Sequence, residues 1–239
     1  MIRANGICKY FRQPDGTVLK ALENVDLEIC DGELLVIAGE NGSGKSLLMR
    51  ILASLEKPSK GTVQADGEIG LVFQDADSQI LADTPLEDVL FGLRGKRGLS
   101  KADARTEAEN ALEKVGLKDF ADSPSHLLSG GQKRRLAVAS ILALGRKTMV
   151  FDEPYSNLDY PGVKSVNAII KELKDKGYTI IILTHELEKC LALADRFIVL
   201  HEGRKVFDGN PSEALKEDLG AWGIHNPAPY GKADGLLWL

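Results

Sequence analysis

A glycine-rich segment near residue 40 contains the residues best suited to chemistry. Residues 39–46 read GENGSGKS and follow the spacing G-x-x-x-x-G-K-[ST]. Glycines at these positions allow backbone amides to turn toward phosphate oxygens, and the positive end of a following helix attracts the same anion. Lys45 is expected to bind the β- and γ-phosphates, and the Ser46 hydroxyl is expected to ligate Mg²⁺. The segment therefore predicts a nucleoside triphosphate site.

Two carboxylates follow a short β-rich stretch at residues 148–151, and they predict what happens to the nucleotide. Asp152 and Glu153 come directly after this stretch. In phosphoryl-transfer sites one such carboxylate holds the metal and a second lies beside the attacking water. We expect Asp152 to hold Mg²⁺ through water and Glu153 to act as the general base. An ordinary strand end can have the same sequence, so this assignment depends on the glycine-rich segment.

A second glycine-rich segment, residues 128–132, reads LSGGQ. Ser129 and the amides of Gly130 and Gly131 form another candidate anion site at the start of a helix. With the first segment, this motif resembles the nucleotide-binding cassette of ABC ATPases, in which LSGGQ contacts the γ-phosphate held by the opposite subunit of a dimer. The resemblance covers about residues 2–219 and implies ATP hydrolysis.

The resemblance assigns further roles. Gln74 matches the Q-loop glutamine that reaches the metal and water, Asp159 matches the D-loop, and His185 matches the switch histidine at the γ-phosphate. Phe11 is the expected adenine-stacking residue, with Tyr10 as the alternative, and either could simply pack in the core. The implied catalytic residues are Lys45, Gln74, Glu153 and His185, and the implied metal ligands are Ser46, Gln74 and Asp152. The implied ATP contacts are Phe11, Gly39, Asn41, Gly42, Ser43, Gly44, Lys45, Ser46, Leu47, Ser129, Gly130, Gly131, Gln132 and Asp159.

One subgroup of the family fits best. Residues 72–79 (VFQDADSQ) and 86–92 (LEDVLFG) resemble the Q-loop region of energy-coupling factor ATPases, which import vitamins, cobalt or nickel. Asp75 and Ala76 replace the common Asn-Pro of that pattern. This likeness implies a second cassette, identical or related, together with a membrane coupling subunit and a substrate-binding membrane subunit. The expected location is the cytoplasmic face of the membrane, with residues 74–79 facing a helix of the coupling subunit or forming only a solvated acidic loop.

Two other features bear on this interpretation. Leu47 stands where the family usually has a hydroxyl, which removes a hydrogen bond to the α-phosphate and weakens nucleotide binding by about 1 kcal/mol. The basic run at residues 132–135 is either a solvated helix face or a nucleic-acid patch. Soluble translation-type cassettes usually occur in pairs within one chain, and DNA-repair cassettes contain a long coiled coil before the signature. The sequence shows neither, so both alternatives rank below transport.

The elements that position these residues alternate between short strands and helices, which predicts an α/β fold. A helix is expected at residues 45–55, and residues 100–103 resemble a capping box that opens a mainly helical insertion covering about residues 85–145. Residues 18–22 and 25–29 predict an N-terminal antiparallel layer. Beyond a helix at residues 212–219, the tail at residues 220–239 is rich in glycine and proline and predicts a surface loop or a partner contact. Buried strands, covered on both faces, are predicted at residues 34–38, 69–73, 148–151, 180–183 and 197–200.

The composition sets limits on function. The 239 residues include 30 Lys and Arg and 35 Asp and Glu, a net charge of −5 that disfavours a general nucleic-acid partner. The longest nearly continuous apolar run, residues 136–144, is too short to span a bilayer. No export signal is recognised at the N-terminus. Cys8, Cys30 and Cys190 are too far apart in the sequence for a metal or disulfide motif, which favours a reducing cytoplasm.

Overall fold

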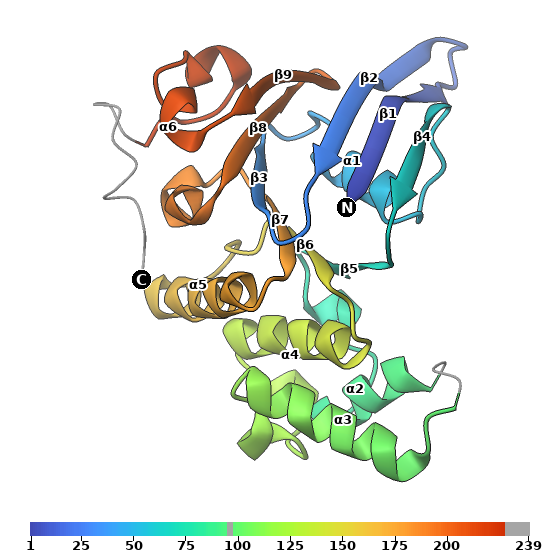
Figure 1. The fold of residues 1–239 in the computed structure, drawn as a ribbon, viewed down its shortest axis with the longest axis vertical. Coiled ribbons are helices and arrows are strands. Elements are labelled where there is room, and N and C mark those ends of the chain that lie inside the picture. Colours follow the sequence, from blue (N-terminus) through green and yellow to red (C-terminus); the bar gives the residue numbers. More distant parts are fainter. Residues whose placement is uncertain (95–97, 228–239) are drawn as a thin grey trace.

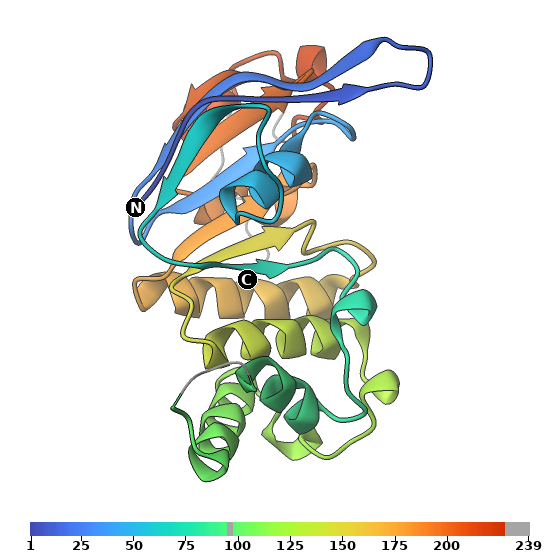
Figure 2. The same ribbon diagram turned by 90° about the vertical axis from the view of Figure 1, so that its right-hand side faces the viewer.

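The computed structural model describes residues 1–94 and 98–227, and they form an α/β fold in layers (Figure 1). A three-stranded sheet lies at one end and a six-stranded sheet lies in the middle. A group of helices forms the other end, as a view turned by 90° also shows (Figure 2). The predicted fold class, a mixed sheet with an antiparallel layer and an inserted helical part, is confirmed.

The six-stranded sheet contains every strand predicted to be buried. Four neighbouring pairs of its strands are parallel, and only the last pair, at one edge, is antiparallel. These strands are continuously apolar because helices or a second sheet cover both faces of the sheet. The order is β5 (Ile69–Val72), β6 (Thr148–Asp152), β7 (Thr179–Leu183), β3 (Leu34–Ala38), β8 (Arg196–His201) and β9 (Arg204–Gly209).

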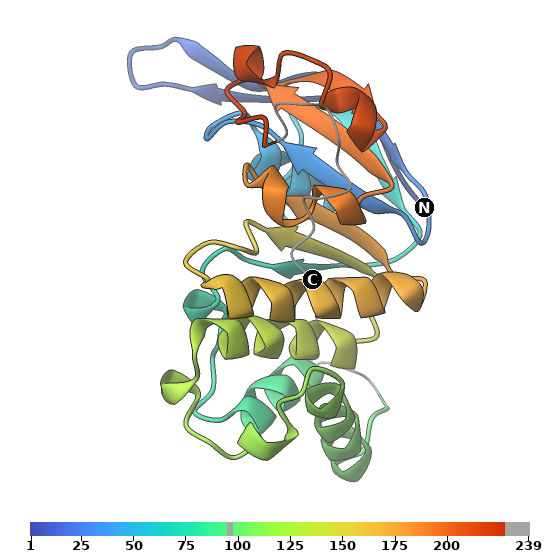
Figure 3. The same ribbon diagram turned by 90° about the vertical axis from the view of Figure 1, so that its left-hand side faces the viewer.

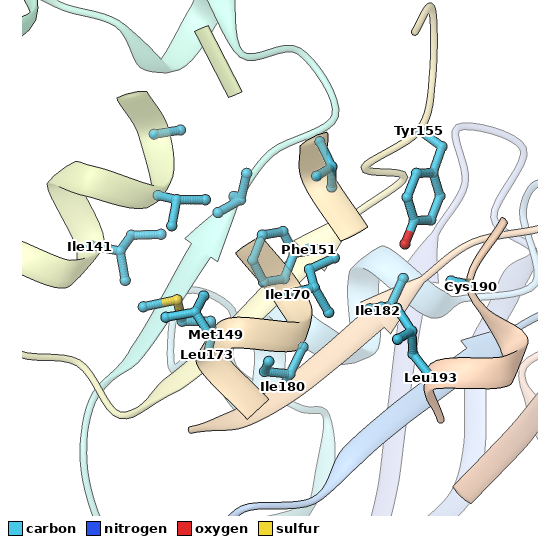
Figure 4. Close-up of a cluster of buried hydrophobic side chains, with 14 of the residues drawn as sticks. Ile141, Met149, Phe151, Tyr155, Ile170, Leu173, Ile180, Ile182, Cys190 and Leu193 are labelled. Carbon is cyan, nitrogen blue, oxygen red and sulfur yellow. The ribbon is translucent and has the colours of Figure 1, made fainter. Parts of the chain in front are cut away.

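Alternate side chains of the six-stranded sheet enter two separate cores. Leu35 and Ile37 of β3 join a core shared with α1 (Lys45–Leu52) and the three-stranded sheet. Leu34 and Val36 join a second core on the opposite face, which includes side chains of α4 (Gly130–Ala143) and α5 (Tyr160–Asp175). Figure 4 shows part of this second core. The sheet is therefore held rigidly between two apolar layers, which fixes the ends of its strands.

The three-stranded sheet has the order β2 (Val18–Ile29), β1 (Ile2–Arg12) and β4 (Lys60–Ala65), with antiparallel pairing. The sequence predicted two short strands where the structure has the single strand β2. The polar break between them is an irregularity at Asn24, whose φ of +53° lies in the left-handed region. Strand β4 was not predicted, because its residues are mostly exposed and lack an apolar pattern.

The helical insertion lies between β5 and β6, as predicted. It contains α2 (Pro85–Leu93), α3 (Lys101–Lys114) and α4. Ser100 caps α3 by accepting a hydrogen bond from the Asp103 amide at 3.1 Å, which confirms the predicted cap. Among the described residues, no helix combines the length and apolarity needed to cross a membrane. The short 3₁₀ helices are η1 (Asp77–Gln79), η2 (Lys118–Phe120), η3 (Ser125–Leu127), η4 (Leu187–Lys189), η5 (Leu191–Leu193) and η6 (Leu219–Trp222).

The C-terminal part differs from the prediction. In place of one helix at residues 212–219, α6 (Pro211–Ala214) and η6 lie beside β8 and β9 (Figure 3). Residues 220–222 belong to η6 although irregular structure was expected. The Trp222 ring lies 6.2 Å from the Phe207 ring, and Ile224 is buried. Apolar packing against the sheet edge overrides the local glycines here, and residues 228–239 of the predicted tail lie outside the described part.

Candidate functional site

The candidate catalytic residues gather at one edge of the six-stranded sheet. Strands β3, β5, β6 and β7 are parallel, so their carboxyl ends meet at the same edge, where α/β proteins bind ligands. Candidate site residues lie at the end of each of these four strands. The segment 39–46 follows β3, Gln74 lies after β5, Asp152 ends β6 with Glu153 directly after it, and His185 lies after β7. The topology therefore brings together residues that are far apart in the chain.

The segment 39–46, here called the phosphate loop, needs glycine at two close approaches. A Cβ on Gly39 would lie 2.2 Å from the Leu200 carbonyl oxygen. Gly44, which caps α1, has a φ of +102°, and a Cβ there would lie 2.7 Å from a Leu22 methyl group. The loop is therefore pressed against the sheet, and its turn directs α1 with its N-terminus toward the strand ends.

Lys45 is buried within the phosphate loop, with 6% of its surface exposed. Its Nζ donates to the carbonyl oxygens of Gly39 at 2.7 Å and Glu40 at 3.1 Å. Burial lowers the pKa of Lys45, and the nearby charges of Glu153 and Asp152 oppose that shift. Only neutral carbonyls pair with this buried ammonium group, so it is well placed to form an ion pair with a negatively charged phosphate.

Ser46 and Asp152 form a pair of oxygen ligands at this edge. Ser46 Oγ donates to Asp152 Oδ1 at 3.1 Å. Burial raises the pKa of Asp152, and the hydrogen bond from Ser46 counteracts part of this rise. In the described residues, no group of three or more His, Cys, Asp or Glu side chains forms a complete metal cage. A hydroxyl and one carboxylate fit Mg²⁺, which is usually bound by one or two carboxylates plus substrate phosphates and water.

Glu153 and His185 form a second pair. Glu153 Oε1 lies 2.9 Å from His185 Nδ1, and the Glu153 amide donates to the Leu183 carbonyl at 2.8 Å. Glu153 has a φ of +45°, in the left-handed region that is unfavourable for a side chain of this type. Its Oε2 is buried and has no hydrogen-bond partner among the described residues. The carboxylate therefore keeps one free acceptor at the strand edge.

A cavity of about 280 Å³ is shared by Lys45, Ser46 and Glu153. Gln74 lines it, and its Nε2 lies 3.4 Å from Ser156 Oγ. Ser156 was not singled out from the sequence, because a serine in a polar turn gives no distinctive pattern. The other residues that line the cavity are Ala21, Asn41, Gly42, Gly44, Lys45, Ser46, Leu47 and Glu153.

The LSGGQ segment lies apart from the phosphate loop. Ser129 caps α4 by accepting a hydrogen bond from the Gln132 amide at 3.3 Å, and the Gln132 side chain accepts one from the Ser129 amide at 2.7 Å. Ser129 and Gly130 are exposed. Helix α1 packs on one face of the six-stranded sheet and α4 lies on the side of the opposite face (Figure 2). The structure therefore does not bring Ser129 to the phosphate loop of its own chain.

Three other candidates have structural partners of their own. Asp159 caps α5 by accepting a hydrogen bond from the Gly162 amide at 2.9 Å. Phe11 is 41% exposed on β1, and Lys9 Nζ lies 5.2 Å from its ring centre. Tyr10 hydrogen-bonds through its side chain to Cys8, which raises the pKa of Tyr10. Phe11 is therefore more available for stacking than Tyr10, and its adenine role stays a prediction.

The basic run at residues 132–135 is not a solvated face, so that prediction is wrong, while the nucleic-acid patch stays a prediction. Arg134 is only 4% exposed and donates to two backbone carbonyls. Arg135 donates to the Val115 carbonyl at 3.0 Å, and Lys133 forms an ion pair with Asp77. Helix α4 packs against α2, α3 and α5, so little of its surface is exposed to solvent. The apolar run that follows Arg135 was the available signal for this burial.

A phosphate loop, a strand-end carboxylate pair and a separate helical part with a glycine-rich helix start define a P-loop ATPase cassette. The family model described as ABC transporter matches residues 22–156, and the chain belongs to this family. It is accordingly an ATP-binding protein and an ATPase, as the sequence predicted.

Known proteins support the same family. The chain is 39% identical over 222 residues to the energy-coupling factor transporter ATP-binding protein EcfA of Methanosphaera stadtmanae, covering 87% of this chain and 79% of that protein. It is 37% identical to the cobalt import ATP-binding protein CbiO of Rhodobacter capsulatus, covering 83% and 76%. The predicted resemblance to energy-coupling factor ATPases is therefore confirmed.

Two solved structures share the fold. CbiO1 from Clostridium perfringens, described as part of the ABC transporter complex CbiONQ, has a TM-score of 0.80 and 33% identity, with 90% of both chains covered. A dimeric ATP-binding cassette in a post-hydrolysis state, bound to ADP and Pi, has a TM-score of 0.79 and 29% identity, covering 88% of this chain and 99% of the other.

Proposed function

We propose that this chain is the ATP-hydrolysing subunit of an importer of energy-coupling factor type, which takes up cobalt, nickel or a vitamin. It acts at the cytoplasmic face of the membrane together with a coupling subunit and a substrate-binding subunit. The names of its relatives, which include a cobalt import protein, support the transport class. The solute itself is recognised by a membrane partner, because the cassette lies outside the bilayer.

The proposed chemistry uses the residues at the sheet edge. Lys45 exchanges its two carbonyl partners for oxygens of the β- and γ-phosphates. The Glu153 carboxylate accepts a proton from the attacking water, while His185 orients that carboxylate and approaches the γ-phosphate. Ser46, Asp152 and Gln74 are the residues that hold Mg²⁺, which neutralises charge on the triphosphate when bound.

The observation that carries the proposal is the separation of Ser129 from the phosphate loop by the six-stranded sheet. Ser129 and Gly130 are exposed at the start of α4, on the side of the sheet opposite to α1. Two cassettes arranged head to tail place this helix start against the nucleotide on the other subunit. ATP binding then drives closure of the pair, and hydrolysis resets it. The partner cassette is a second copy or a related chain.

A groove that includes Phe73, the residue before Gln74, supports a membrane partner. Its volume is about 350 Å³, and Met49, Leu55 and Phe73 line it together with Ser46 and Asp152, so it reaches the proposed Mg²⁺ ligands. Leu55 and Phe73 are 59% and 39% exposed, so both offer apolar surface at the same groove. A helix of the coupling subunit that lays its apolar face here would sense the position of Gln74.

Purification in mild detergent with ATPase and uptake assays tests this function. We expect membrane polypeptides to stay bound to the wild-type chain, and Leu55→Asp to release them while the isolated chain still binds ATP. Uptake of cobalt, nickel or a vitamin by vesicles containing the complex should require ATP. Full ATPase activity by a strict monomer, or an absence of any membrane partner, would overturn the proposal.

A further inference from the structure

A buried arginine connects two loops of the ATP site. The guanidinium of Arg134 donates through Nη2 to the Gln74 carbonyl at 2.6 Å and through Nη1 to the Pro154 carbonyl. Its side chain is 4% exposed. Neither partner is a carboxylate, so burial of this charge is not compensated by an ion pair. The Nε of Arg134 is buried without a hydrogen-bond partner among the described residues, so the two carbonyls are the hydrogen-bond contacts that hold the buried charge.

The two carbonyls belong to segments that are expected to act on the nucleotide. Gln74 lines the cavity of the phosphate loop, and Pro154 directly follows Glu153. Both carbonyls lie outside helices and strands, where they lack the regular partners of a backbone group. Arg134 therefore fixes the backbone at both places.

Because Arg134 lies on α4, its two hydrogen bonds connect the start of this helix to both loops. Ser129 caps the same helix one and a half turns earlier, so the two residues move together as parts of one rigid element. Lys133 adds a second link from this turn to the Gln74 loop through its ion pair with Asp77. A displacement of the helix start therefore reaches the Gln74 loop and the Glu153 segment without passing through the six-stranded sheet.

We infer that Arg134 is a positioning residue, which transmits movement of the LSGGQ helix to Gln74 and Glu153 together. It touches neither nucleotide nor metal. Its planar fork holds two carbonyls at once, which the single ammonium group of lysine cannot do with the same geometry. This inference deepens the proposed function, because it rests on ATP hydrolysis by the assembled cassette pair.

Arg134→Met and Arg134→Lys test the inference, with Arg135→Met as the matched control on the next residue. Arg135 donates to the Val115 and Gly116 carbonyls and so ties α4 only to the end of α3. Amide hydrogen exchange measured without nucleotide should rise at least tenfold in both 74–78 and 153–157 for Arg134→Met. In Arg135→Met the rise should be confined to residues 115–118. Arg134→Lys should protect one of the two segments and not the other.

Steady-state kinetics on the complex of cassettes and membrane subunits provides the second measurement. Arg134→Met should lower kcat about tenfold or more and leave the affinity of the isolated chain for ATP within threefold, because the phosphate loop is untouched. Arg135→Met should keep kcat near wild type. Unchanged exchange in either segment, or equal losses of kcat in Arg134→Met and Arg135→Met, would overturn the inference.

These results are distinguishable from failure of the proposed function. A wild-type complex that neither hydrolyses ATP nor binds membrane subunits contradicts the function, whatever the variants do. A wild-type complex that hydrolyses ATP normally, with an Arg134→Met variant that does the same, contradicts only the role of Arg134. Thermal unfolding of all variants shows whether loss of the whole fold, rather than loosening of the two segments, explains a loss of kcat.

Discussion

Glu153 Oε1 and His185 Nδ1 lie 2.9 Å apart, although 32 positions separate the two residues in the chain. They follow neighbouring parallel strands, and the pairing of Asp152 with Leu183 sets their relative height. A carboxylate that a histidine holds at one oxygen, and whose second oxygen has no partner among the described residues, is suited to act as a base toward water. The sheet register therefore determines which carboxylate of the Asp152–Glu153 pair is available as a base.

Glu153→Gln removes the base and keeps its shape. We expect turnover to fall by about 10²–10⁴ while ATP binding is retained, since proton transfer by a positioned base contributes that factor. Steady-state hydrolysis and equilibrium ATP binding measure the two effects. Glu172→Gln, an exposed change on α5, should leave both unchanged. Turnover near wild type in Glu153→Gln would show that the base lies elsewhere.

Ser129→Phe tests whether the helix start serves a second cassette. Loss of the cap costs about 1 kcal/mol of stability, and Ser100→Phe loses the same kind of cap on α3. Only Ser129→Phe fills the space beside Gly130, so only this variant should lose turnover and ATP-dependent dimerisation. Size-exclusion chromatography with ATP, in the Glu153→Gln background, measures the dimer. Equal behaviour of the two serine variants would contradict contact across a dimer.

Phe11→Ala and Tyr10→Ala separate the two candidates for adenine stacking. Stacking on a base contributes about 1–3 kcal/mol and is made alike in the ground and transition states. We therefore expect Phe11→Ala to raise KM for ATP about tenfold with little change in kcat. Tyr10→Ala, which removes the side-chain contact with Cys8, should alter KM much less. The reverse ranking would move the adenine contact to Tyr10.

Leu47→Thr restores the hydroxyl that this chain lacks after Ser46. One added hydrogen bond to the α-phosphate is worth about 1 kcal/mol, so the Kd for ATP should fall about fivefold. Leu47→Val is the control, because it has the same branched shape without a hydroxyl. Isothermal titration measures both variants. If they bind ATP equally, the hydroxyl is irrelevant at this position.

Glu23→Gln tests the acid sensitivity of the contact between β2 and β9. Hydrogen bonds from Lys20 and Arg204 lower the pKa of Glu23 from 4.5 to about 2. Because the folded-state pKa lies below the unfolded value, the carboxylate stabilises the fold above about pH 4.5 and loses that effect toward pH 2. The wild type should therefore unfold at a higher temperature than Glu23→Gln at pH 7, and the difference should vanish near pH 2. A difference that persists unchanged at pH 2 would contradict this role.

Elements could be predicted from the sequence where local geometry or burial allows only one type of residue. The phosphate loop could be located because glycine alone fits at Gly39 and Gly44, and the central strands because their residues are continuously apolar. Strand β4 could not be predicted, since an exposed sheet edge imposes little pattern on its residues. The partners of Arg134 could not be predicted either, because they are backbone carbonyls, which any sequence supplies, although the apolar run after Arg135 signalled that this helix is buried.

The fold of the C-terminal residues shows the same limit. Glycines around residue 220 indicate irregular structure by themselves, but Trp222 and Ile224 pack against the sheet edge. Tertiary contacts of this kind are not encoded in a local pattern. The site roles inferred from resemblance stay predictions, and the experiments above test them.

The left-handed backbone conformation of Glu153 implies a conflict between the stability of the fold and the proposed hydrolysis of ATP. A glycine or asparagine would adopt that conformation with less strain, so selection for heat resistance alone favours their replacement of the glutamate. Either exchange discards the carboxylate. Under the catalytic role proposed for Glu153, stabilising substitutions must therefore occur at other positions, and a more heat-stable relative that lacks this glutamate is expected to hydrolyse ATP poorly.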